Sequence, residues 1–259
     1  MKIEKKRLKD ELTRVVGENP IFYLKFTSQR TYAEDVSNGK LYMNTVQYYR
    51  ELEEKMRIKG QGDRDELKQL LDIFNIQIID KRTDNLFLSF PFGKATFEID
   101  GDKDIFLFCL TGITIKDLEI IEYDDESADL QLPFPKDKID NIRKDFGEHV
   151  VIINGPSFDN LINRKINGIE ESALFGKVNY TEHNFIEKIN AYNTFSAKRF
   201  LYKGIDFSYQ KEFRLALQKE FVIDNYFSIN SISDISHICT IDELIDYRIN
   251  VSYDLCEIV

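Results

Sequence analysis

Residues 95–113, ATFEIDGDKDIFLFCLTGI, contain two apolar, β-forming runs on either side of the polar segment DGDK. An Asp-Gly pair between two such runs is typical of the tight turn of a β-hairpin. We therefore expect the two runs to be neighbouring antiparallel strands joined at Asp100-Gly101. Two similar runs, IFNIQII at 73–79 and LFLSFPF at 86–92, come shortly before them. The whole central region is therefore predicted to be antiparallel.

Helices are expected mainly before this region. Apolar residues recur at helical spacing near the start, which predicts a helix over residues 4–16 that docks on one face. Ser28 is suited to cap a second helix that ends at Gly39, and Asn44 or Thr45 to cap a third. Later strands do not alternate regularly with helices, which disfavours a doubly wound parallel sheet. We predict an α+β fold with a mostly antiparallel, mixed sheet and N-terminal helices.

The chain length of 259 residues suits one large domain. Only five Pro and 12 Gly are present, and no long flexible linker is apparent. We therefore predict a single domain over residues 1–259. Its parts are the docked helix at 4–16, a core over roughly 20–220 and a β-rich extension over 221–259.

The composition is that of a globular protein, with 42% hydrophobic and 31% charged residues. The formal net charge of −10 disfavours nucleic acid as a main partner, because phosphate binding needs a basic surface. No apolar stretch approaches the roughly 20 residues that cross a bilayer, and the charged segment at residues 1–16 lacks the apolar core of a signal peptide. The three cysteines, Cys109, Cys239 and Cys256, lack metal-ligand spacing. We expect reduced thiols, a cytoplasmic location, no membrane association and either a protein partner or a homo-oligomer.

Residues 206–217, DFSYQKEFRLAL, resemble a half-buried strand. Side chains two apart on a strand share a face, so Ser208, Gln210, Glu212 and Arg214 are expected to form one polar row. Such a row can line a cleft, where Glu212 stays ionised beside Arg214 and Gln210 orients a ligand or Glu212 itself. Alternatively, the row faces water and contains one weak ion pair.

Two basic groups complement this row. Lys25 shares a face of the first predicted strand with Tyr23, where it can contact a phosphate or extend along the sheet surface. Lys198 and Arg199, together with Lys203, are the best candidate for a local basic group in an acidic chain. These positions suit an anionic small ligand held between the basic group and the polar row.

The segment GDRDE at 62–66 places Asp63, Asp65 and Glu66 in a short glycine-containing loop. Hard cations prefer oxygen ligands of this kind. The spacing does not match a calcium loop, and no His or Cys accompanies it, so a solvated acidic loop is favoured and no metal is expected. A metal-dependent nuclease built on Asp63, Glu66 and Glu212 is the least favoured hypothesis, because the charge balance opposes it.

Several segments together suggest a family. They are YLKF, YAEDVSNGKLYMNT, GDRDE, DIFLFCLTGI, EHVVIIN, FGKVNY and KRFLYKGIDFSYQKEFRL. In this order they resemble a large uncharacterised bacterial and phage domain family with an Asn-Asp-Pro-x-Glu-type loop and a late E-x-R strand. The likeness covers roughly residues 20–220. This chain departs from the pattern at the loop, which lacks Asn-Asp-Pro, and at Gln210, where an acid is common.

A weaker likeness is to mono-ADP-ribosyltransferases, which share the polar first strand, the Gly-Lys-Leu turn and a late Gln-x-Glu strand. That resemblance implies that NAD is the cofactor, that Glu212 and Gln210 are catalytic, and that Lys25 takes the place of the usual Arg or His. Tyr23, Lys198, Arg199 and Arg214 would then bind the ligand. A role in conflict between bacteria and phages would follow.

The alternative hypothesis is a binding module without chemistry. It would block or sense a partner protein through the N-terminal helix and the acidic loops at 61–66 and 122–129.

Overall fold

The computed structural model describes residues 4–57, 61–134, 136–169, 172–182 and 184–253. Cys256 and the end of the predicted C-terminal extension lie outside these residues. The α-helices are α1 (Lys5–Val16), α2 (Arg30–Ser37), α3 (Val46–Met56), α4 (Lys136–Phe146), α5 (Gly155–Ile166), α6 (Ile186–Asn193) and α7 (Ile241–Ile245). The strands are β1 (Phe22–Thr27), β2 (Lys40–Tyr42), β3 (Asn44–Thr45), β4 (Gln69–Ile79), β5 (Leu86–Phe97), β6 (Phe106–Ile113), β7 (Glu119–Tyr123), β8 (Ser127–Gln131), β9 (His149–Asn154), β10 (Ala173–Lys177), β11 (Asn179–Thr181), β12 (Tyr202–Gly204), β13 (Glu212–Leu217), β14 (Tyr226–Ser228), β15 (Ser236–Thr240) and β16 (Arg248–Ser252).

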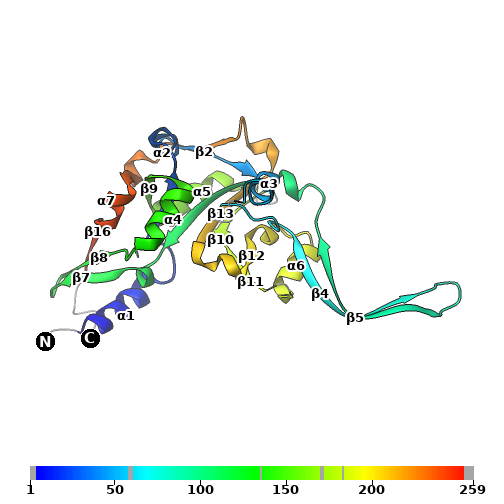
Figure 1. Ribbon diagram of the computed structural model, residues 1–259. Coiled ribbons are helices and arrows are strands. Elements are labelled where there is room, and N and C mark those ends of the chain that lie inside the picture. Colours follow the sequence, from blue (N-terminus) through cyan, green and yellow to red (C-terminus); the bar gives the residue numbers. More distant parts are fainter. Residues whose placement is uncertain (1–3, 58–60, 135, 170–171, 183, 254–259) are drawn as a thin grey trace.

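A central sheet with the strand order β10-β13-β6-β1-β9-β15 organises the molecule (Figure 1), and β3 also pairs with β6. Every pairing in this sheet is antiparallel. The short pair β11–β12 is parallel. The predicted α+β fold with a mostly antiparallel, mixed sheet is therefore confirmed.

Each face of the central sheet covers its own hydrophobic core. Successive side chains of a strand point to opposite faces, so β6 sends Phe108 to one core and Leu107 to another. Helices α2 and α5 pack on the Phe108 face, through residues such as Val36 and Phe158. Helix α1 packs against the other side through Leu8 and Leu12, together with α7 and the sheet β16-β8-β7.

The helix starts and ends follow the expected local chemistry in most cases. The predicted N-terminal helix is α1, and the hydroxyl of Thr45 caps α3 by accepting a hydrogen bond from the amide of Tyr48. Gly39 follows α2 with a φ of 80°, as expected. The predicted cap at Ser28 is wrong, because α2 begins one residue later, with Gln29 at the cap position.

The predicted hairpin at Asp100-Gly101 is wrong. A turn is present there, and Gly101 has a φ of 91°, but the turn leads through a short 3₁₀ helix into β6. Strand β5 pairs with β4 instead and includes both 86–92 and most of the run at 95–99. The strands β4 and β5 form a long hairpin that projects away from the body (Figure 1), and we call residues 69–97 the arm.

The last part of the described chain is distributed over three sheets. β14 pairs with β2, β15 pairs with β9 at the edge of the central sheet, and β16 pairs with β8. Residues 226–252 therefore pair with strands that lie much earlier in the chain. Over the described ranges, no helix combines the length and the apolar character that a bilayer crossing requires.

Candidate functional site

A cleft of about 530 Å³ lies over the face of β6 and β13 that carries Cys109 and Arg214. Its volume falls within the range of small-molecule binding sites. Helix α3 contributes Tyr48 and Tyr49 to the wall, and α4 contributes Ile142 and other residues. The further lining residues used below are Lys25, Glu66, Lys203, Gln210 and Glu212.

The cleft lies where two neighbouring strands separate. Strands β1 and β6 pair only from Phe22 to Leu24, and β1 then continues along β9 alone. Lys25 follows directly, and its ammonium donates a hydrogen bond to the carbonyl oxygen of Cys109 at 3.0 Å. It also lies 4.5 Å from the centre of the Phe108 ring. Lys25 thus satisfies a carbonyl that strand pairing leaves free and marks one edge of the cleft.

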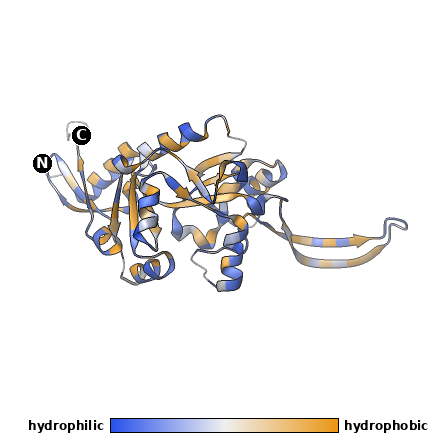
Figure 2. Ribbon diagram, turned by 90° about the horizontal axis from the view of Figure 1, so that it is seen from above, coloured by the Kyte–Doolittle hydropathy of each residue, from blue (hydrophilic) through white to orange (hydrophobic). Residues whose placement is uncertain are grey.

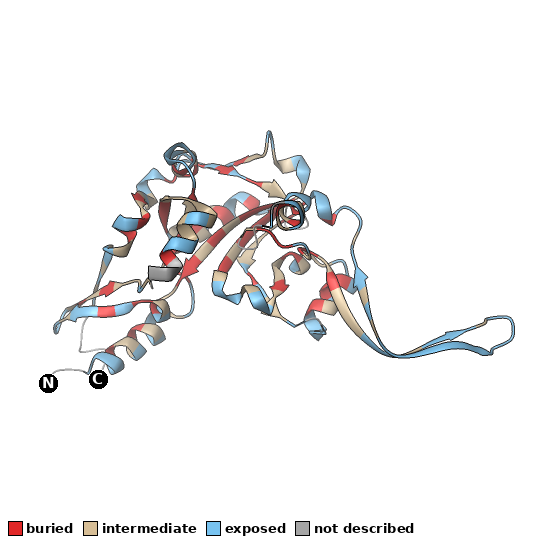
Figure 3. Cartoon of the chain, in the orientation of Figure 1, coloured by how far each residue is buried: buried red, intermediate tan, exposed pale blue. Residues whose placement is uncertain are grey.

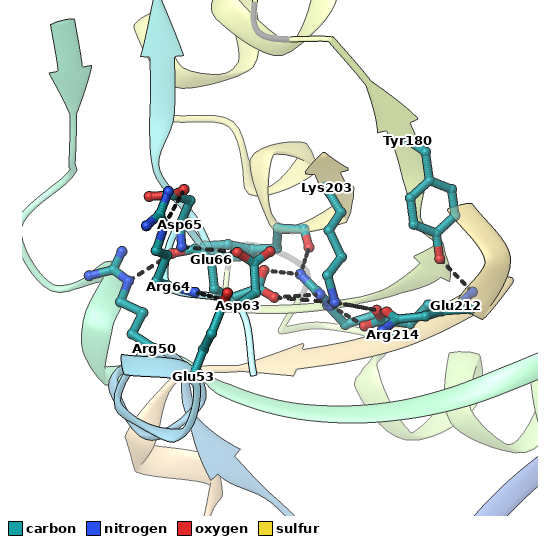
Figure 4. Close-up of polar contacts among 12 residues, drawn as sticks. Arg50, Glu53, Asp63, Arg64, Asp65, Glu66, Tyr180, Lys203, Glu212 and Arg214 are labelled. Carbon is teal, nitrogen blue, oxygen red and sulfur yellow. Dashed lines mark hydrogen bonds and ion pairs between the residues drawn. The ribbon is translucent and has the colours of Figure 1, made fainter. Parts of the chain in front are cut away.

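Four buried charged side chains form a closed ring beside the cleft, which we call the charge ring (Figure 4). Arg214 donates to Glu66 at 2.8 and 3.1 Å and to Glu212 at 2.8 Å. Lys203 lies 3.2 Å from the other oxygen of Glu212 and 3.7 Å from Glu66. Two cations and two anions therefore alternate, and the ring as a whole is neutral.

Neighbouring charges decide the ionisation of the ring. Burial alone would raise the pKa of Glu212, but the charges of Arg214 and Lys203 outweigh it and hold that pKa well below its ordinary value. Burial would likewise lower the pKa of Lys203, yet the carboxylates of Glu212 and Glu66 raise it. We conclude that Glu212 and Lys203 stay charged at neutral pH, so Glu212 acts as a fixed negative charge instead of a proton acceptor.

Other groups at or near the cleft lack such compensation. Burial lowers the pKa of Lys25, against the opposing effects of Cys109 and Glu212. Burial also raises the pKa of the Cys109 thiol to about 12, so this cysteine is a poor nucleophile. Next to the ring, burial and the charge of Glu66 together raise the pKa of Asp63 to about 7.

The predicted polar row is only half formed. Residues 205–210 form a 3₁₀ helix, and Lys211 then adopts a left-handed conformation with a φ of 47°. Ser208 therefore does not belong to the strand, which begins at Glu212. Gln210 nevertheless lines the cleft. Its side-chain oxygen accepts a hydrogen bond from Lys203 at 2.9 Å, which holds it beside the charge ring.

Glu212 and Arg214 do share a face, but both are buried, so the alternative of a strand facing water is wrong. The amide of Glu212 also donates to the hydroxyl of Tyr180 at 2.8 Å, which fixes the start of the strand.

The favoured interpretation of residues 62–66 as a solvated loop is wrong for two of its acids. Asp63 and Glu66 are buried, and Glu66 belongs to the charge ring. Only Asp65 is partly exposed, where it pairs with Arg64 at 3.4 Å. This segment is consequently unavailable as the acidic docking surface of the binding-module hypothesis. Over the described part of the chain, no cluster of His, Cys, Asp and Glu is arranged to hold a metal.

Three predicted ligand-binding residues lie away from the cleft. Tyr23 is in the core on the opposite face of the sheet, where its hydroxyl donates to Asp159 at 2.6 Å. Arg199 forms a two-pronged ion pair with Asp102, at 2.9 and 2.7 Å. Lys198 is exposed. The structure therefore brings together Lys25, Gln210, Glu212 and Arg214, and separates the other three from them.

Sequence patterns missed several residues of the site. The sequence pattern groups Lys203 only with the neighbouring basic residues, and it gives no indication that Cys109 or Tyr49 belongs to the site. The register of β13 on β6, which places Cys109 opposite Arg214, is a long-range pairing that no local pattern encodes.

No protein-family model matches the sequence, and neither a curated protein nor a solved structure matches it significantly. The likenesses to the bacterial and phage family and to mono-ADP-ribosyltransferases remain predictions.

Proposed function

We propose that the protein binds a small anionic molecule, NAD or a related nucleotide, in the cleft beside the charge ring. The observation that carries this proposal is the state of Lys25. Four cationic side chains line the cleft: Lys25, Lys203, Lys211 and Arg214. Within the described residues, Lys25 is the one among them that has no carboxylate within ion-pair distance, because Lys211 pairs with Asp117.

An anionic ligand in the cleft would supply the negative charge that Lys25 lacks nearby. Burial lowers the pKa of Lys25 and so disfavours its protonated form, whereas a phosphate nearby would favour that form. The rings of Tyr48 and Tyr49 lie in the same wall, with their centroids 5.5 Å apart and their planes at 83°. Aromatic rings of this kind can pack against a base. A phosphate group and an aromatic base together describe a nucleotide.

The geometry supports binding better than ADP-ribosyl transfer. In that chemistry a carboxylate stabilises the cationic sugar that forms as nicotinamide leaves. Both carboxylate oxygens of Glu212 already contact cations, Arg214 at one and Lys203 at the other, so its negative charge is largely compensated. Transfer would require Lys203 or Arg214 to move away from Glu212 when the substrate binds.

The experiment is a thermal-shift titration with NAD, ADP-ribose, ADP and inorganic phosphate. We expect at least one nucleotide to raise Tm for the wild type and to do so much less for Lys25→Met. Lys198→Met removes an exposed lysine outside the cleft and serves as the matched control, with an unchanged response. Equal shifts in Lys25→Met and the wild type would contradict the assigned position of the anion.

An assay for the release of nicotinamide from NAD distinguishes nucleotide binding alone from transfer or hydrolysis at the ribose. Turnover by the wild type that is lost in Glu212→Gln, with nucleotide binding intact, would establish transfer or hydrolysis at the ribose. Binding without release establishes a sensor or carrier of the nucleotide.

A further inference from the structure

The arm is the part of the molecule with the least support from the rest of the chain. Within the described residues, β4 pairs only with β5 and β5 only with β4, so the ribbon has two open edges. Figure 3 shows the outer part of the arm as exposed on both strands. A two-stranded hairpin standing alone in water is marginally stable. The arm therefore calls for a surface that covers it.

The side chains of the arm are unusually apolar for such exposure (Figure 2). Three apolar cross-strand pairs lie along it: Phe74 with Phe92, Ile76 with Phe90, and Ile78 with Leu88. The rings of Phe74 and Phe92 are 5.5 Å apart. The large apolar side chains of the arm that are between 36% and 75% exposed are Ile73, Phe74, Ile78, Ile79, Leu86, Phe87, Leu88, Phe90, Phe92 and Phe97.

The exposed apolar area of one face reaches the size that a specific dimer needs. The large side chains on the face of the cross-strand pairs are between 44% and 63% exposed: Phe74, Ile78, Leu88, Phe90 and Phe92. With about 200 Å² for each side chain, their exposed fractions amount to roughly 500 Å². Two arms packed through this face would bury about 1000 Å² in total, which is the lower limit for a specific interface.

Charge and shape indicate what kind of surface covers the arm. Residues 69–97 contain three acids and three bases, so the arm is neutral, although the whole chain carries −10. Nucleic acid and anionic membranes attract an excess of positive charge, which the arm lacks. The tip, DKRTDN at 80–85, is polar, whereas a hairpin that enters a bilayer would carry its apolar residues at the end. The apolar residues lie along the shaft instead, which suits packing against protein.

A second copy of the chain meets these requirements. Two identical arms related by a twofold axis can place these apolar pairs against each other, because a twofold interface uses the same patch on both subunits, and two neutral arms do not repel each other. The arm projects far from the body (Figure 1), so two acidic bodies can stay apart while their arms touch. An unrelated acidic or basic partner would have no such match with a neutral ribbon.

The arm is suited to contact through its faces instead of its edges. Pro91 provides no backbone N–H within β5, and proline is typical of edge strands. Asn75 has a φ of 54° within β4 and interrupts the other edge. Both features oppose extension of the ribbon by further strands. We propose that two copies of this chain form a dimer in which the apolar faces of their arms pack against each other.

The test is the mass in solution, measured by sedimentation over a range of protein concentrations. We expect the wild type to have twice the 30.5 kDa mass of the chain at micromolar concentration. The double variant Phe74→Ser/Phe92→Ser should dissociate at least about 100-fold more readily, because two adjacent apolar anchors are lost. The matched control is Ile186→Ser, which changes an equally exposed apolar side chain on α6 and should leave the dimer intact.

Hydrogen exchange provides a second, independent measurement. Protection of the arm amides should increase with protein concentration in the wild type and not in the double variant, while protection of the body stays the same. A monomeric wild type overturns the proposal, and co-flotation of that monomer with lipid vesicles would assign the arm to membranes. Dimerisation of the double variant as tight as that of the wild type overturns it equally.

Discussion

The charge ring should respond to the removal of single charges very differently from the removal of a neutral pair. Arg214→Met leaves Glu66 and Glu212 without their main partner. It also leaves the carbonyl oxygen of Phe200 without the hydrogen bond that Arg214 donates to it in the wild type, at 2.9 Å. Glu212→Gln leaves two cations facing one anion. Either single change places an uncompensated charge in a site that water barely reaches.

The expected magnitudes follow from these contacts. Breaking a buried ion pair by removing one partner costs about 3–5 kcal/mol. We expect Arg214→Met at the upper end of this range and Lys203→Met at the lower end, because the contacts of Lys203 are longer, at 3.2 and 3.7 Å. The double variant Arg214→Met/Glu212→Gln keeps one charge of each sign. Its cost should therefore fall short of the sum of the two singles by about 2–3 kcal/mol.

The assay is urea-induced unfolding monitored by circular dichroism. Urea is uncharged, so it does not screen the ion pairs of the ring. Arg143→Met is the control, because this arginine lies on the surface in pairs with Glu148 and Asp242. Its loss should cost far less than the loss of Arg214, because surface ion pairs contribute little to stability. Additive costs in the Arg214/Glu212 double variant would refute the reasoning, since they would show that the two side chains do not share one electrostatic network.

Three further predictions concern other positions. Between pH ~4 and ~7, native Asp63 retains a proton that the unfolded chain releases. The free energy of unfolding of the wild type should therefore fall with rising pH, relative to that of Asp63→Asn, by up to about 1.4 kcal/mol per pH unit. Urea unfolding at pH 5 and 7 measures this, and the same pH dependence in both proteins would contradict it. Nucleotide affinity should fall as pH rises, because only protonated Lys25 attracts an anion and burial lowers the pKa of this lysine. Titration calorimetry at pH 6.5 and 9 tests this prediction. An affinity that does not change with pH would contradict it. Gly39→Ala should lower the stability measured by thermal unfolding by about 2–4 kcal/mol, because the φ of Gly39 is 80° and a Cβ would lie 2.5 Å from the carbonyl oxygens of 229–230. Gly101 also has a positive φ but has open space around it, so Gly101→Ala should lower stability by about 1 kcal/mol. Equal losses in the two variants would show that the close approach at Gly39 is unimportant.

Local patterns predicted the elements of the fold well and their partners poorly. The helix α1, the Thr45 cap and the run at 106–113 all follow from periodicity and from residues close in sequence. The Asp100-Gly101 pair does make a turn, but the neighbours of the strands on either side are chosen by packing over long distances. Among the described strands, β6 pairs with β13, β1 and β3, whereas β5 pairs only with β4.

The candidate site shows the same division. The spacing of Glu212 and Arg214 placed them on one face, as the structure has them. The sequence could not show that Glu66, from a segment resembling a solvated loop, would complete their charge balance. It also could not show that Arg199 would be neutralised by Asp102, because the two lie 97 residues apart. Burial of a charge depends on partners brought in from elsewhere, and periodicity contains no information about them.

The distribution of residues 226–252 over three sheets has a consequence for synthesis of the protein. Strands β2, β8 and β9 emerge from the ribosome long before β14, β16 and β15, which cover their open edges. A nascent chain therefore exposes unpaired strand edges until residues 226–252 have also emerged. We expect these sheets to be completed only then, and chaperone binding to be strongest before that point.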